Sequence, residues 1–103
     1  MNTHHGDWSL VATATGVGRD SSDLVFASAT PVGVMLTIGR PESILAVTVR
    51  VNGIDVPDGT LEASETSRTF LFADVTSIHL VVGAVLPGYD RIRISGTYEI
   101  SLV

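Results

Sequence analysis

Hydrophobic and polar residues alternate along most of this chain with a period of two residues. Trp8, Leu10 and Ala12 share one side of the first such segment, and Phe70 and Phe72 share one side of a later one. This alternation is typical of a β-strand with one buried face, because successive side chains point to opposite sides of a strand. The same pattern predicts about eight strands. They cover residues 7–15, 22–29, 31–38, 44–51, 54–56 extended into 60–62, 67–73, 77–82 and 90–102.

Glycine-containing turns separate several of these segments. Asn52-Gly53 predicts a two-residue hairpin turn, because this pair tolerates the positive φ angles that a type I′ turn requires. Pro57-Asp58-Gly59 follows closely and predicts a second chain reversal. Gly96 lies inside the last predicted strand, where a glycine indicates a bulge or bend.

Short strands at intervals of eight to twelve residues, with turns between them, are the pattern of an antiparallel sandwich or barrel. We therefore predict an all-β chain that forms a single-domain antiparallel β-sandwich of the jelly-roll or Ig-like kind. A small β-barrel is the alternative, because it shares the same alternation. Residues 1–6 are expected to form a flexible N-terminal segment, and residues 7–103 the sandwich domain.

Composition narrows the class of protein. The chain has 103 residues, of which 45% are hydrophobic and 17% charged, which favours one small folded domain over a disordered segment. Its hydrophobic runs are interrupted within about ten residues, too short for a membrane-spanning helix, so we expect no membrane partner. Eleven acidic and six basic residues give a net charge of -5, which disfavours nucleic acid as a partner. The absence of cysteine excludes a disulfide scaffold and thiolate metal sites.

Residues that could carry out catalysis are few. The histidines are His4, His5 and His79, and none belongs to a recognisable catalytic motif. His4 and His5 are neighbours on the expected flexible segment, which lacks the spacing of a preorganised metal site. We therefore predict no enzyme activity, no cofactor and no built metal site. A small oligomeric β-barrel enzyme would require His79 in a closed pocket with two carboxylates.

Five residues are candidates for a ligand or subunit interface: Trp8, Tyr89, Tyr98, Arg91 and Arg93. The three aromatic rings would bind a glycan if they formed an exposed platform, but a single tryptophan near a strand start more often covers a core. Arg91 and Arg93 share one strand face. They would grip a carboxylate or phosphate, or form a salt bridge across strands or subunits.

Apolar residues exceed what one small sandwich needs to fill its interior. Those expected to point outwards are Val11, Val25, Met35, Val81 and Val85. Such residues would leave apolar patches in water unless another subunit covered them. The sequence therefore predicts a homo-oligomer, a dimer or trimer, or docking on a larger protein assembly.

The combination favours a non-enzymatic structural protein that packs through apolar β surfaces. These features best suit a bacteriophage virion component, such as a capsid decoration, minor capsid or tail protein. This interpretation is an analogy and does not rest on a sequence motif. The alternative is a lectin-like, carbohydrate-binding sandwich, for which exposed aromatic rings beside Asp or Asn would argue. The chain starts without a basic region followed by an apolar stretch, so we expect no signal peptide and cytoplasmic synthesis.

Overall fold

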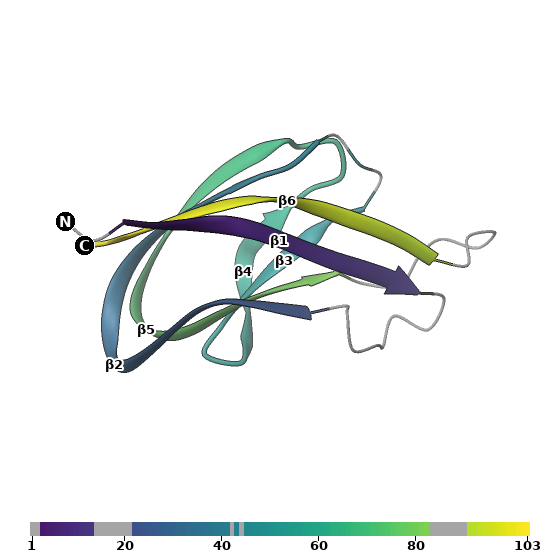
Figure 1. The fold of residues 1–103 in the computed structure, drawn as a ribbon. Helices are drawn as coiled ribbons and strands as arrows, with labels where there is room; N and C mark the ends of the chain where they lie inside the picture. The colour runs from purple at the N-terminus through teal and green to yellow at the C-terminus, as the bar shows by residue number, and fades with distance from the viewer. Residues whose placement is uncertain (1–2, 14–21, 42, 44, 83–90) are drawn as a thin grey trace.

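The described residues of the protein form six β-strands joined into one antiparallel sheet (Figure 1). A computed structural model describes residues 3–13, 22–41, 43, 45–82 and 91–103. The strands are β1 (Thr3–Thr13), β2 (Ser22–Gly39), β3 (Val47–Val51), β4 (Ile54–Leu61), β5 (Ser67–Val82) and β6 (Arg91–Leu102). Their order in the sheet is β1-β6-β2-β5-β3-β4. The prediction of an all-β, antiparallel single domain is confirmed. Across the described ranges, no helix is long and apolar enough to cross a membrane.

The predicted count of about eight strands is not confirmed, because four of the predicted strands merge into two. The predicted strands 22–29 and 31–38 are one strand, β2, and 67–73 and 77–82 are one strand, β5. The β2–β5 ladder continues through register shifts, the largest between Ala27 and Val32. Bulges let a ladder bend sharply without ending, so residues that punctuate a sequence need not end a strand.

These bends divide the sheet into two halves that share one core. The β1 half contains β1, β6, residues 34–39 of β2 and residues 67–72 of β5. The β3 half contains residues 22–27 of β2, residues 77–82 of β5, β3 and β4. Figure 1 shows β2 and β5 curving at the end of the molecule where β1 begins.

Side chains from both halves form a continuous hydrophobic cluster. Buried members are Trp8, Leu10, Ala12, Val25, Val34, Leu36, Ile38, Leu45, Val47, Val49, Leu61, Phe70, Val75, Ile78, Leu80, Val82, Ile94 and Ile100. Phe26 and Phe72 pack against this cluster, as their apolar segments predict. Burial of each large apolar side chain contributes about 1.5–3 kcal/mol, so this shared core is what holds the two halves together.

The predicted hairpin at Asn52-Gly53 is confirmed. Both residues have positive φ, 54° and 83°, and they join β3 to β4. The second chain reversal predicted at residues 57–59 is absent, because β4 continues through Pro57, Asp58 and Gly59. Asp58 adopts a φ of 60° there, and the β3–β4 ladder shifts register nearby. The turn-forming residues therefore produce an irregular edge strand instead of a turn.

β1 pairs with β6 along the whole length of β1 without a bulge. Each residue from Thr3 to Thr13 has a partner between Ser101 and Arg91. Residues 3–6 therefore belong to β1, although the sequence predicts that the strand begins at residue 7. Gly96 marks a close backbone approach instead of a bulge. A Cβ atom at this position would overlap the Gly39 carbonyl oxygen and lie 2.8 Å from the Trp8 ring.

Two of the valines expected to point outwards are buried. Val25 lies at a register shift between Leu24 and Phe26, which turns its side chain into the core, where it is 8% exposed. Val11 is 4% exposed, close to where the start of β2 reaches β1. Met35 is exposed as predicted, whereas Val81 is half-buried and Val85 lies outside the described residues.

Candidate functional site

Trp8 lies in the core and is 1% exposed. Its indole Nε1 donates a hydrogen bond of 3.0 Å to the Thr97 carbonyl oxygen, and its ring lies against Gly96. The donor of a buried indole needs such a partner, and the backbone of β6 supplies it. Since a buried ring cannot present its face to a sugar, Trp8 covers the core and contributes nothing to an aromatic platform.

Tyr98 is half-buried on β6, opposite Gly6 of β1. Its phenol ring occupies the space that a side chain at position 6 would need, because a Cβ there would lie 2.8 Å from the hydroxyl oxygen. Tyr89, the third ring of the expected platform, lies outside the described residues. Of the two candidate rings that the structure describes, Trp8 is buried and Tyr98 packs against the core, so this pair forms no exposed platform.

Arg91 and Arg93 lie on β6, opposite Thr13 and Val11 of β1. Their positions share one face of the strand, as their spacing predicts, and Arg93 is exposed. Two ion pairs are present among the described residues, Arg50–Asp55 and Arg68–Glu65, and neither includes Arg93. Arg93 instead lines a small cavity of about 220 Å³ between β6 and the segment that follows β2.

The histidines form no metal-binding cluster in the described part of the chain. His79 is half-buried on β5 between Leu24 and Arg50, and its Nδ1 atom is buried without a hydrogen-bond partner. His4 and His5 are exposed on β1, where consecutive side chains point to opposite faces. Among these residues, no three His, Asp or Glu side chains come close enough to hold a metal ion.

A polar groove of about 540 Å³ crosses the outer face of the β1 half. Cross-strand pairing builds it in rows: Asp7, Thr97, Gly39 and Ser67 lie opposite one another in succession. The next row contains His5, Glu99, Thr37 and Thr69, and the two threonine hydroxyls are 2.9 Å apart. The groove lining is His5, Gly6, Asp7, Thr37, Gly39, Ser67, Thr97, Tyr98 and Glu99.

An apolar patch adjoins this groove on the same face. It consists of Met35, Leu71 and Val103, which are 40%, 71% and 75% exposed. Met35 lies directly opposite Leu71 on β5 and opposite the buried Ser101 on β6. The Val103 N–H donates to the Gly33 carbonyl oxygen at 3.0 Å, which fixes Val103 beside β2. Met35 and Leu71 are therefore neighbours on paired strands, and Val103 lies beside β2, two residues along from Met35.

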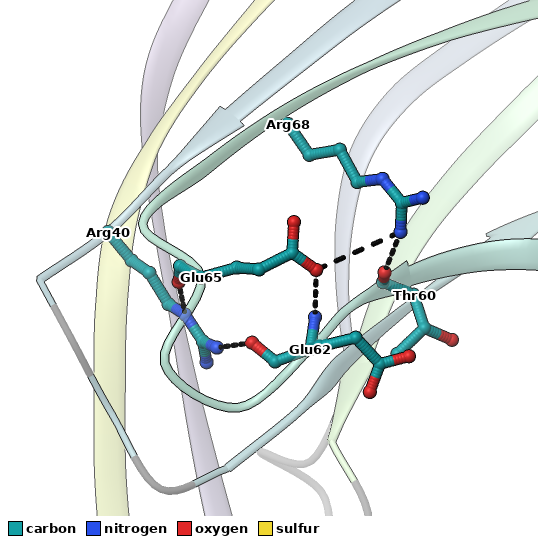
Figure 2. Close-up of polar contacts among 5 residues, drawn as sticks. All are labelled: Arg40, Thr60, Glu62, Glu65 and Arg68. Carbon is teal, nitrogen blue, oxygen red and sulfur yellow. Dashed lines mark hydrogen bonds and ion pairs between the residues drawn. The ribbon is translucent and has the colours of Figure 1, made fainter.

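Arg40 forms a buried polar centre that the sequence analysis missed (Figure 2). Its Nε donates to the Glu65 carbonyl oxygen at 3.0 Å, and its other nitrogens donate to the carbonyl oxygens of Glu62, at 2.6 Å, and Leu45. Burial lowers the pKa of Arg40, and the Glu65 carboxylate opposes this shift without cancelling it. An arginine remains charged at neutral pH despite such a shift, because its ordinary pKa is so high.

The contacts of Arg40 tie three segments together. The Arg40 backbone N–H also bonds the Thr66 carbonyl oxygen at 2.8 Å, so one residue holds the end of β2 to the β4–β5 turn. In the same turn, the Glu65 carboxylate accepts the Glu62 N–H at 2.8 Å and lies 3.9 Å from Arg68 (Figure 2). With its donors directed at carbonyl oxygens, Arg40 has a structural role. The sequence contains a sign that Arg40 is buried, since it follows the buried residues Leu36 and Ile38 at the same spacing of two.

No protein-family model and no curated protein matches this sequence. Among solved structures, a similar chain comes from a study described as "Bacillus endospore appendages form a novel family of disulfide-linked pili". The two chains are 10% identical, with a TM-score of 0.45 over 95% of this chain and 85% of that chain. Similarity at this distance leads to no functional conclusion. These 103 residues contain no cysteine.

Proposed function

We propose that this chain is a non-enzymatic structural protein that assembles with copies of itself. The bent sheet would act as a two-layered sandwich whose outer face carries the contact surface. The observation that supports this role is the apolar patch of Met35, Leu71 and Val103. The burial of Trp8 also supports this role, because it removes the strongest candidate for a sugar-binding ring.

Contact between two copies suits the chemistry of the patch. Met35 and Leu71 carry no charge, so two copies can bring these side chains together without burying an unpaired ion. Met35 adds a flexible side chain that adjusts to an opposing surface. Apolar area removed from water stabilises such a contact by about 25 cal/mol per Å².

Light scattering coupled to size-exclusion chromatography, over a dilution series, tests this proposal. We expect a discrete oligomer for the native chain and a lower mass for Leu71→Ser. The matched control is Ile54→Ser, because Ile54 is also 71% exposed but lies beside the hairpin turn of the β3 half. The control is expected to keep the native mass. A native chain that is monomeric at every concentration would overturn the proposal. Equal masses for both variants would show that the apolar patch is not the contact surface.

Within this class we propose a bacteriophage virion component: a capsid decoration, minor capsid or tail protein. The support is the sequence itself, a small cysteine-free β-domain without catalytic residues. Negative-stain electron microscopy of the purified chain tests this setting. Closed oligomers of fixed size are expected for a decoration protein, whereas open filaments would argue against it.

A carbohydrate-binding module is the second candidate, and the polar groove favours it. Hydroxyl and carboxylate groups from Asp7, Thr37 and Glu99 line the groove, and sugars bind to such polar groups. A glycan array compares the native chain with Asp7→Ala and Glu99→Ala. Binding that both variants lose would support this function, and absence of binding to the array would argue against it.

A further inference from the structure

The free edge of β1 presents backbone groups that no strand of the described sheet uses. In an antiparallel sheet, alternate residues of a strand direct both their N–H and C=O groups to one neighbouring strand. The Val103 N–H donates to the Gly33 carbonyl oxygen of β2. Residues 97, 99 and 101 of β6 are also odd-numbered, so their backbone N–H and C=O groups are directed at β2 as well. The intervening residues of β6 then face β1.

The pairing register carries this alternation into β1. Even-numbered residues of β1 lie opposite even-numbered residues of β6, whose N–H and C=O groups are directed at β1. The even-numbered residues of β1 therefore bond β6, and the odd-numbered residues direct their backbone groups away from β6. The Ser9 N–H agrees independently, because it donates to the Asp23 carboxylate at 3.3 Å. Asp23 thus covers the edge at Ser9. Before Ser9, the odd-numbered residues Thr3, His5 and Asp7 have exposed side chains, and no strand of the described sheet covers this part of the edge.

The two outer edges of the sheet differ in how they are protected. Proteins block pairing at an edge strand with proline, bulges or irregular backbone. The β4 edge carries Pro57 and the positive φ of Asp58, and its ladder with β3 is interrupted. The β1 edge has an unbroken register from Thr3 to Thr13 and contains no proline. It is therefore suited to accept another strand.

We propose that this edge pairs with the same edge of a second copy, antiparallel, with the two-fold axis at Gly6. This register places His5 of each copy opposite Asp7 of the other. The short ladder therefore contains two equivalent pairs, each of an imidazole and a carboxylate. Moving the axis to His5 or to Asp7 would place identical side chains opposite each other, which disfavours pairing when they are charged. Gly6 suits the axis because its own side-chain space is filled by Tyr98.

The inference rests on the proposed self-assembly and assigns it a second, separate contact. The edge and the apolar patch belong to different parts of the β1 half, so each can be removed alone. Leu71→Ser removes the patch, and the edge contact is then tested in this background by the same light-scattering measurement. We expect Leu71→Ser to be a dimer at high concentration.

A proline variant tests the backbone contact. His5→Pro removes an N–H that faces the free edge, so the β1–β6 ladder is kept. The expected result is a monomer. His5→Ala is the matched control, because it keeps the N–H and is expected to remain largely dimeric. A circular dichroism spectrum like that of the parent shows that the proline variant is folded.

A charge-exchange series tests the register and does not depend on proline. His5→Glu places a carboxylate opposite Asp7 of the second copy, twice in each dimer, and should raise the dissociation constant about fivefold. His5→Glu combined with Asp7→Arg makes both pairs attractive and should restore or exceed the parent affinity. The introduced carboxylate also lies opposite Glu99 of its own chain, but both variants share this contact.

The outcomes separate this inference from the proposed patch contact. A Leu71→Ser variant that is monomeric, or a dimer that His5→Pro leaves intact, overturns the edge contact. Equal affinities throughout the charge-exchange series overturn the register. If Leu71→Ser keeps the full native mass while His5→Pro lowers it, the edge contact stands and the patch contact falls.

Discussion

The side-chain amide of Asn52 donates a hydrogen bond of 2.9 Å to the carbonyl oxygen of Asp74. Both residues have positive φ, 54° at the hairpin turn and 56° at the bend of β5. The Asn52 Oδ1 atom also accepts the N–H groups of Thr76, at 2.7 Å, and Ser77, at 3.1 Å. One side chain therefore fastens the β3–β4 turn to the place where β5 passes between the two halves.

Replacing Asn52 is expected to destabilise this junction. Asn52→Ala removes three backbone contacts and places alanine in a left-handed conformation, so we expect a loss of about 1–2 kcal/mol in unfolding free energy. The value is kept low because the contacts are exposed and water replaces part of them. Urea unfolding measures the change.

Asn52→Asp is the matched control, because it keeps the accepting oxygen and also tolerates positive φ. It replaces the donor to Asp74 with a carboxylate oxygen that repels the Asp74 carbonyl oxygen, but it keeps the acceptor for Thr76 and Ser77 and should still cost less than Asn52→Ala. Equal losses for the two variants would contradict the role assigned to the accepting oxygen.

The buried guanidinium of Arg40 leads to a second prediction. Arg40→Met leaves the carbonyl oxygens of Leu45, Glu62 and Glu65 without their donor, at a cost of about 2–4 kcal/mol. Arg68→Met is the control, since that side chain is 40% exposed and should cost less than about 1 kcal/mol. Chemical denaturation of both variants measures the difference. Similar losses for the two would argue against Arg40 as the structural centre of this turn.

Local signals allowed much of the fold to be predicted. The alternation of Trp8, Leu10 and Ala12 correctly identifies the buried face of β1, and Asn52-Gly53 correctly identifies the hairpin. Both signals depend on neighbouring residues alone: a strand alternates with a period of two, and positive φ favours asparagine and glycine. Predictions of this kind succeed wherever no distant segment changes the outcome.

The predictions from sequence are wrong where contacts between distant segments determine the strand boundaries or the burial of a side chain. Asp74 looks like a strand boundary in the sequence, yet Asn52, 22 residues away, holds its carbonyl within a continuous strand. Val11 looks outward by alternation, but the start of β2 lies close to that end of β1. Arg40 fits the buried alternation, but an arginine before a proline looks like a loop residue. Its three carbonyl partners cannot be deduced from sequence spacing.

Gly96 leads to a prediction about close packing between backbones. Gly96→Ala forces a Cβ atom against the Gly39 carbonyl oxygen and the Trp8 ring, so we expect a loss of about 3 kcal/mol. Gly53→Ala is the control: it has a φ of 83° but nothing within 4 Å, and should cost about 1 kcal/mol. At roughly 4–8 °C per kcal/mol, thermal unfolding separates the two variants clearly. A Gly96→Ala variant as stable as Gly53→Ala would show that β6 can move away from Gly39 of β2 and from Trp8 of β1 with little loss of stability.

Trp8 provides an optical test of the core and of the assembly together. It is the only tryptophan, it is buried, and its Nε1 bonds the Thr97 carbonyl oxygen. Its fluorescence should resist quenching by acrylamide, and dilution through the dissociation of the oligomer should leave that resistance unchanged, because the ring faces the core and not either contact surface. Trp8→Phe should cost about 1–2 kcal/mol through the orphaned carbonyl and the smaller ring. Quenching that rises on dilution would instead place Trp8 at a subunit contact, and the platform interpretation of this residue would return.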